Sequence, residues 1–374
     1  MKAIFTGCVL LALTACSQTP KTTQQSVEDS SYTEATEAKP YQLQGTTTFA
    51  IDSKETGSVY NISVSVPDSY AHAGSTKTYP VIYVLDGQWR FPLVYSIVGA
   101  ITEDGDMPEA LIVSISWQET NNNLLALRGR DLTPTATAEI PQSGEAIKFQ
   151  NFLRNQLFPY IEKNYKGSTH RTVTGGSFSG LFAVYTLLTQ PDLFDGYIAA
   201  TPSLWWDEHS INYFFKQFPN KPLSKRTRFY LSWGKLESAD YIRRFGEDLK
   251  NKEIPNLEVT YAPVENSGHS AVNAESYTKG LQFVFQKDDL LLPQARLKAL
   301  AGQYKSQDDL DDIQFIIKDG KLQAVFSDGN RFMLNATSNN EFYIQGNAMI
   351  FTFNSTTQAL QLSSRGTEFN YIRR

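Results

Sequence analysis

Cysteine is almost absent from this chain. Only Cys8 and Cys16 occur among the 374 residues, and both lie within the first sixteen positions. A disulfide, a zinc–thiolate site or thiol catalysis in the body of the protein is therefore excluded. Histidine is also scarce, with four in the chain, so a catalytic imidazole has few possible sources.

A basic surface is missing as well. Lys and Arg number 34 against 39 Asp and Glu, which gives a formal net charge of -5. Without a basic stripe, nucleic acid is not an expected partner. The chain does have 41% hydrophobic residues and five Trp, an ordinary globular composition that leaves room for an apolar binding cleft.

The N-terminus has the form of a targeting segment. Lys2 precedes an apolar run over residues 3–15 that is too short to span a membrane and resembles a signal peptide. The run ends in Leu-Thr-Ala-Cys at Cys16, which resembles a bacterial lipobox; a plain signal peptide is the alternative. We expect residues 1–15 to be a lipoprotein signal peptide and Cys16 to carry the lipid that anchors the protein to a membrane of the bacterial cell envelope. Residues 16–40 are too polar to fold and predict a disordered tether.

Residues 41–290 alternate between apolar strands and helical spacing. Strands are expected at 59–66, 80–85, 110–117, 172–174, 196–201, 228–233 and 257–261, and helices at 145–165, 181–188 and 241–250. This alternation predicts an α/β fold with a doubly wound, mainly parallel sheet. Pro159 predicts a break or kink within the first of these helices. Ligands of such sheets gather at the carboxyl ends of strands, so the loops that follow the strands are the candidate site.

A strand, two glycines, a serine and a helix follow one another around Ser177. This is the setting of a nucleophile elbow, in which small residues permit the sharp turn and the hydroxyl stands clear of the sheet. The usual elbow is Gly-x-Ser-x-Gly, and Ser179 stands where the second glycine belongs. A strand–helix loop that merely contains serine is the alternative interpretation.

A serine hydroxyl needs a base to become a nucleophile. His72 lies in a polar loop, His170 is at the wrong end of its strand, and His209 follows a pair of tryptophans. His269 comes just after the last strand, in the chain order serine, acid, histidine. His269 is therefore the candidate base.

The acid that orients His269 is expected in the loop after residues 228–233. Glu237 and Asp240 are the candidates, and Glu237 is favoured because it is closer to the strand end; Asp240 has the alternative role of capping the next helix. Backbone donors for an oxyanion are expected from Phe178 and from Gly87 or Gln88.

Residues 41–290 resemble the esterase D-like esterases of the α/β-hydrolase superfamily, a group that includes trilactone-siderophore esterases, S-formylglutathione hydrolases, feruloyl esterases and mycolyltransferases. The resemblance is carried by Tyr79–Gly87, Arg128–Pro134, Phe158–Glu162, Thr174–Phe182 and Thr201–Asp207. It implies Ser177 as nucleophile, His269 as base and an acid near Glu237, although some siderophore esterases use a Ser–His dyad.

The Arg-x-Arg-Asp-Leu-Thr-Pro stretch is most similar to the siderophore-esterase branch. It implies that Arg130 binds an anionic or oxygen-rich part of the substrate; the alternative is an ion pair that holds the loop, for example with Asp131. Trp89 and Trp205 are further candidates for substrate binding, and the pair Trp205 and Trp206 either walls the cleft or packs in the core.

Residues 303–374 change character, with 291–302 as the expected linker. Short strands are expected around the Asp319-Gly320 turn within 315–326 and at 341–344, 348–353, 360–362 and 369–372. They predict a small all-β domain, a barrel or sandwich similar to the lipocalin-like modules behind other secreted hydrolases. No chemistry is predicted for it.

Together these features predict a membrane-tethered serine carboxylesterase that acts through an acyl-enzyme on siderophore-type lactones or small acyl esters. No metal or organic cofactor is implied. The alternatives are acyl transfer to an alcohol on the same residues, and a non-catalytic surface binding lipoprotein that keeps the hydrolase fold.

Overall fold

The computed structural model describes residues 40–374 except 73, 75, 119–122, 355 and 365–366. The expected signal peptide, Cys16 and nearly all of the expected tether lie outside the described residues, so they stay predictions. In the part of the chain that is described, no helix is both long and apolar enough to cross a membrane.

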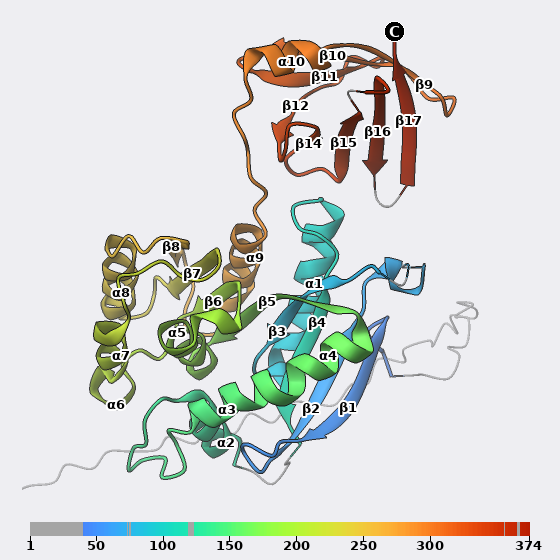
Figure 1. Ribbon diagram of the computed structural model, residues 1–374. Helices are drawn as coiled ribbons and strands as arrows, with labels where there is room; N and C mark the ends of the chain where they lie inside the picture. The colour runs from blue at the N-terminus through green and yellow to red at the C-terminus, as the bar shows by residue number, and fades with distance from the viewer. Residues whose placement is uncertain (1–39, 73, 75, 119–122, 355, 365–366) are drawn as a thin grey trace, which may run out of the picture. The chain divides into compact units, whose positions relative to one another are not determined.

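The first sheet is mainly parallel, as the alternation of strands and helices predicts (Figure 1). Its strands are β1 (Thr46–Asp52), β2 (Val59–Ser65), β3 (Tyr79–Val84), β4 (Leu111–Trp117), β5 (Gly167–Gly176), β6 (Gly196–Ala200), β7 (Thr227–Gly234) and β8 (Leu257–Val264). They lie in the order β1-β2-β4-β3-β5-β6-β7-β8. β2 is antiparallel to both β1 and β4, and the remaining neighbours are parallel.

The central strands are apolar on both faces. In β3, Tyr83 contributes to one hydrophobic core and its neighbours Ile82 and Val84 to the other. Successive side chains of a strand point to opposite faces, so a strand covered by helices on both sides becomes a continuous apolar run. The unbroken apolar character of residues 80–85 therefore follows from the central position of this strand in the sheet.

Helices cover both faces, which confirms the doubly wound arrangement. The core on one face includes side chains of α1 (Gly87–Glu103) and α9 (Val272–Val284). The core on the other face includes side chains of α2 (Leu124–Leu132), α3 (Ala146–Phe152), α4 (Phe158–Tyr165), α5 (Phe178–Thr189), α6 (Trp206–His209), α7 (Ile211–Gln217) and α8 (Asp240–Asn251). Two short 3-10 helices are η1 (Asp68–His72) and η3 (Pro191–Leu193).

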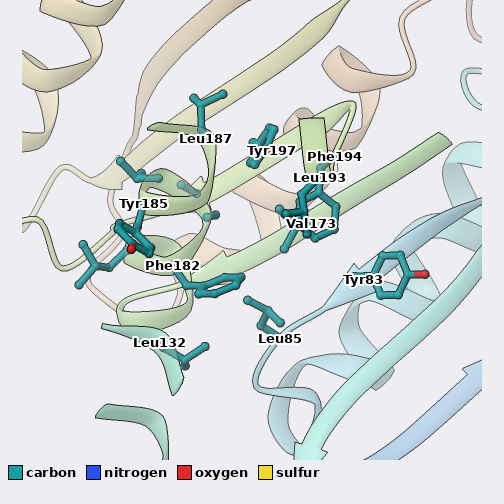
Figure 2. Packing of buried hydrophobic residues seen from close by; sticks show 14 of the residues in the cluster. Tyr83, Leu85, Leu132, Val173, Phe182, Tyr185, Leu187, Leu193, Phe194 and Tyr197 are labelled. Carbon is teal, nitrogen blue, oxygen red and sulfur yellow. The ribbon is translucent and has the colours of Figure 1, made fainter. Parts of the chain in front are cut away.

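Helix α5 is buried from Phe178 to Leu188. Figure 2 shows its side chains Phe182 and Tyr185 in the same core as Tyr83 of β3 and Val173 of β5. A helix packed this densely has little freedom to shift, so the residue at its N-terminus is held firmly in place.

The helical segment before β5 does not break at Pro159. A π-helical turn, η2 (Leu153–Leu157), joins α3 directly to α4. Proline has no N–H to donate and crowds the preceding turn, and a π turn is one way in which a helix absorbs such a defect. In place of the expected break or kink, the structure has a π-helical turn within one continuous helical segment.

The second sheet is antiparallel throughout and has nine strands. They are β9 (Gly302–Ser306), β10 (Ile313–Lys318), β11 (Lys321–Phe326), β12 (Arg331–Met333), β13 (Asn335–Ala336), β14 (Glu341–Tyr343), β15 (Met349–Asn354), β16 (Ala359–Ser364) and β17 (Thr367–Arg373). The outermost strands β12 and β13 are consecutive in the chain, separated only by Leu334. The sheet is thus nearly closed, in keeping with the expected small barrel.

The turn between β10 and β11 follows directly from the sequence, whereas the helix before β9 does not. Asp319 and Gly320 both have positive φ, 49° and 77°, which is the two-residue turn that Asp-Gly favours between antiparallel strands. Leu297 and Leu300 of α10 (Gln294–Leu300) lie in the hydrophobic core of this sheet, so part of the expected linker 291–302 belongs to this core.

Candidate active site

Ser177 occupies a strained turn between β5 and α5. Its φ of 60° and ψ of -121° lie where residues other than glycine rarely occur, at a cost of about 1–3 kcal/mol. Gly175 cannot carry a side chain, because a Cβ there would lie 2.5 Å from the backbone carbonyl carbon of Ser179. The elbow geometry therefore occurs at the residue for which the sequence predicts it.

His269 is paired with a carboxylate. Its Nδ1 lies 2.7 Å from Oε2 of Glu237, which leaves Nε2 as the free ring nitrogen. Asp240, the alternative acid, instead begins α8 and forms ion pairs with Arg243 and Arg244. The structure thus brings Glu237, and not Asp240, to His269.

Glu237 is fixed by two further donors. The Thr201 hydroxyl lies 2.8 Å from Oε1 and 3.0 Å from Oε2. The backbone N–H of Gly234 donates to Oε1 at 3.1 Å. These contacts, together with His269, leave the carboxylate little freedom to rotate.

The Ser177 hydroxyl rests against another serine. Its Oγ lies 3.2 Å from Oγ of Ser203, a contact that the sequence does not suggest. Ser177 and His269 nevertheless line one cavity of about 180 Å³, whose remaining lining residues are Asp86, Trp89, Arg90, Arg128, Gly176 and Asn273. The hydrogen bond between a nucleophile and its base is often long before substrate binds. The presence of Ser177 and His269 in one cavity therefore agrees with a nucleophile–base pair.

The expected oxyanion donors belong to two helix N-termini. Phe178 is the first residue of α5, and Gly87 and Gln88 are the first two of α1. The N–H groups of a first helical turn have no acceptor within the helix, and the helix dipole favours negative charge there. Gly87 has no room for a side chain, since a Cβ would lie 1.9 Å from Oγ of Ser114.

Ser179 connects the elbow to the loop before α1. Its buried hydroxyl donates a hydrogen bond to Oδ2 of Asp86. The same carboxylate receives Nε and Nη2 of Arg128 at 2.7 and 2.8 Å. The serine that departs from the usual elbow pattern therefore takes part in a buried hydrogen-bond network.

Arg130 is not among the residues that line the cavity. Its Nε and Nη2 lie 2.7 and 2.9 Å from the carboxylate oxygens of Asp131, which also accepts hydrogen bonds from Tyr60 and Trp117. Burial alone lowers the pKa of Arg130, but the hydrogen bonds and charge of Asp131 outweigh it and the net pKa is raised. The structure thus shows the alternative contact, an ion pair within the fold, and the role of Arg130 as a substrate clamp stays a prediction.

Arg128 stands at the cavity where Arg130 was expected. Its guanidinium carbon is 5.6 Å from the centre of the Trp89 ring and 5.3 Å from that of Phe178, distances at which a cation is attracted to an aromatic face. Trp89, one of the expected binding residues, lines the cavity and is 52% exposed.

The two adjacent tryptophans have different environments. Trp206 is buried and its Nε1 donates to the carbonyl oxygen of Thr135 at 3.0 Å, which is core packing. Trp205 is 50% exposed and its ring centre is 6.4 Å from that of Phe178. Only Trp205 of the pair is therefore available to a bound molecule.

Asn273 of α9 is a cavity residue that sequence reasoning misses. Its Nδ2 donates to the carbonyl oxygen of Ser270 at 2.8 Å, while Oδ1 is buried and has no hydrogen-bond partner among the described residues. A Cβ at Gly176 would lie 2.3 Å from that Oδ1, so the glycine makes room for the amide.

Across the described ranges, no group of three His, Cys, Asp or Glu residues is suited to a metal ion.

A doubly wound sheet with a strained serine turn between a central strand and a buried helix is the fold of an α/β hydrolase. The chain belongs to the family described as "Putative esterase", whose model matches residues 53–244. The match includes Ser177 and Glu237 and ends before His269.

Relatives with assigned activities are similar over much of this chain. Ferri-bacillibactin esterase BesA of Bacillus subtilis is 29% identical over 277 residues, which is 66% of this chain and 92% of that protein. The siderophore triacetylfusarinine C esterase of Aspergillus fumigatus is 29% identical over 200 residues, 48% of this chain and 65% of that protein. The crystal structure of the BES protein from Bacillus cereus has a TM-score of 0.61 and 28% identity, with 67% of this chain and 98% of that chain covered. The family and these relatives support hydrolase activity, of the esterase type, for this chain.

Proposed function

We propose that the protein is a serine carboxylesterase whose nucleophile is Ser177. The observation that carries this proposal is that a serine in a strained elbow shares a cavity with His269, whose Nδ1 is bound to Glu237. A carboxylate on Nδ1 places the proton there and leaves Nε2 to act as the base. These are the parts required for acyl transfer to serine.

The reaction begins when the Ser177 hydroxyl exchanges Ser203 for Nε2 of His269. Oγ then attacks the ester carbonyl as Nε2 takes its proton, and the imidazolium is stabilised by Glu237. The carbonyl oxygen becomes an oxyanion that accepts hydrogen bonds from Phe178 N–H and from Gly87 or Gln88 N–H. His269 returns the proton to the leaving alcohol, and water cleaves the acyl-enzyme by the same steps.

The names of the relatives and the side chains that line the cavity support a substrate class for this proposal. Ferri-bacillibactin and triacetylfusarinine C are the compounds in the names of two relatives, and siderophore-type lactones are accordingly the first substrates to test. Trp89 is half exposed and lines the cavity together with Arg128. Trp205 is also half exposed; it is not among the lining residues, and its ring centre is 6.4 Å from that of Phe178. Aromatic faces beside a guanidinium suit flat, oxygen-rich groups, and small acyl esters are the simpler alternative.

The proposal includes a lipid anchor at Cys16 in the bacterial cell envelope, supported by the lipobox-like sequence that ends there. Mass spectrometry of the intact protein expressed in bacteria is expected to show an acylated N-terminal cysteine and loss of residues 1–15. A Cys16→Ala variant that is acylated and membrane-bound like the wild type would contradict the anchor.

The esterase proposal is tested by ester turnover of the full-length chain. Ser177→Ala is expected to lower kcat/KM by about ten-thousandfold or more on short-chain nitrophenyl esters and on siderophore lactones. Ser96→Ala, at an exposed serine of α1, is the matched control and should leave turnover unchanged. Wild-type turnover by Ser177→Ala would overturn the proposal, and products acylated on an added alcohol would identify acyl transfer in place of hydrolysis.

A further inference from the structure

Thr201 has a backbone conformation that its side chain disfavours. It directly follows β6, is 2% exposed, and has a φ of 40°. Positive φ is unusual for a β-branched residue and costs free energy unless the surroundings hold the residue in place. Strain in a buried residue often marks a functional position, so the contacts of the Thr201 side chain are of interest.

The Thr201 hydroxyl is directed at a single group, the Glu237 carboxylate. It lies within 3.0 Å of both carboxylate oxygens, while the Thr201 backbone N–H donates to the carbonyl oxygen of Ser232 at 2.6 Å. The hydrogen bond to Ser232 fixes the backbone of Thr201 to β7. The side-chain hydroxyl of Thr201 is then free to donate to the Glu237 carboxylate. Hydrogen bonds to a charged acceptor are stronger than those between neutral groups.

The segment that contains Thr201 is also tied to the nucleophile elbow. The Ser177 N–H donates to the carbonyl oxygen of Ala200 at 3.1 Å, and the Ser203 N–H donates to the carbonyl oxygen of Ser177 at 3.1 Å. Residues 200–203 therefore touch the elbow with their backbone and the acid with a side chain. This short segment therefore connects the proposed nucleophile, Ser177, to the Glu237 carboxylate through hydrogen bonds.

We propose that Thr201 is a positioning residue that holds Glu237 in the orientation in which it supports His269. The inference rests on the proposed function, because it assigns Thr201 a part in the same reaction. Thr201 itself does not touch the substrate. It acts through the carboxylate, and its loss lets the carboxylate rotate away from Nδ1.

Three substitutions at Thr201 in the full-length chain distinguish the effect of the hydroxyl on activity from the effect of the strained backbone. Thr201→Val keeps the shape and removes the hydroxyl, and should lower kcat about 10- to 100-fold with little change in KM. Thr201→Ser keeps the hydroxyl and should stay within about threefold of wild type. Thr201→Gly relieves the positive φ, so it should fold at least as well as Thr201→Val and still lose activity. An active Thr201→Gly variant would overturn the proposal.

A double-mutant cycle with Glu237→Ala decides whether the effect passes through the acid. If it does, adding Thr201→Val to Glu237→Ala lowers kcat by no more than about twofold. Losses that multiply in the double variant would overturn the proposal, as would wild-type kcat in Thr201→Val.

Ser177→Ala is measured beside these variants to distinguish the two proposals. If Ser177→Ala keeps its turnover, the proposed function itself fails. If Ser177→Ala is inactive and Thr201→Val is fully active, only the role of Thr201 is rejected.

Discussion

Among the described residues, positive φ at non-glycine positions is fully or partly buried only beside the first sheet. In the described part of the second sheet it is confined to exposed positions, which the first sheet's loops also have, for example at Glu253 and Asn256. In the first sheet, Asp86, Ser177 and Thr201 combine positive φ with full or partial burial, and each follows a parallel strand at its carboxyl end. In the second sheet, Asp319 and Gln358 have positive φ in exposed positions next to strands. Exposed strain of this kind is what tight turns require, whereas buried strain has to be maintained by surrounding contacts and often marks a functional site.

The direction of the strands explains why the candidate site lies at the first sheet. Parallel strands end at the same edge, so the loops after β3, β5, β6, β7 and β8 converge. The second sheet joins neighbouring strands mostly by short turns and fills its interior with aromatic side chains such as Phe315, Phe351 and Phe353. Four predictions test this contrast, from the largest expected effect to the smallest.

The largest effect is expected at His269. His269→Ala removes the only imidazole that lines the cavity containing Ser177, so kcat should fall about a thousandfold or more with the fold intact. Steady-state ester hydrolysis measures the loss, and circular dichroism checks the fold. His72→Ala, in η1 and not among the residues that line the cavity, is the control. Near-wild-type kcat in His269→Ala would contradict the assigned base.

Asp86 should matter mainly for stability. Its carboxylate and the Arg128 guanidinium have side-chain exposures of 5% and 14%, so Asp86→Ala leaves a largely buried cation without its partner. The free energy of unfolding should fall by about 3–5 kcal/mol, as measured by urea denaturation. Glu368→Ala in the second sheet, where an exposed carboxylate accepts from Gln361, should change it by less than about 0.5 kcal/mol. Equal effects in the two variants would contradict the contrast between the sheets.

Ser179 tests the departure from the usual elbow pattern. Ser179→Ala removes one donor from the buried Asp86 carboxylate and should cost about 1–3 kcal/mol of stability. Ser179→Gly restores the usual pattern and also lacks the hydroxyl, so it should lose at least as much. Both are measured by urea denaturation. A stability equal to that of the wild type in both variants would show that the hydrogen bond to Asp86 contributes nothing.

The smallest effect is expected in the second sheet. Gly320→Ala places a side chain at a φ of 77° with open space around it, so it should cost about 1 kcal/mol through backbone strain alone. Ester turnover should not change. A loss of kcat beyond about twofold would mean that the second sheet takes part in the reaction.

Much of the fold and part of the candidate site could be predicted from the sequence. The apolar runs indicated the central strands, and the rule that ligands collect at strand ends selected the loops of Ser177, Glu237 and His269. The wide turn before Pro159 could not be predicted, because a proline signals a defect in a helix and does not specify how the helix absorbs it.

The sequence could not predict that Arg128, and not Arg130, lines the cavity. Both lie on α2, and residues two apart on a helix point about 200° away from each other. The sequence does not reveal which side of α2 faces the cavity, so the motif alone could not choose between them. Thr201 and Asn273 were missed for a related reason, since their contacts with Glu237 and Gly176 join separate segments of the chain.

The central claim is that Ser177 is a nucleophile activated by the site at the carboxyl edge of the first sheet. Its most direct test is peptide mass spectrometry of the full-length chain after reaction with a fluorophosphonate. We expect one phosphonyl group, on Ser177, with labelling strongly slowed in His269→Ala. An unlabelled wild-type protein, or a label on another serine, would contradict the claim.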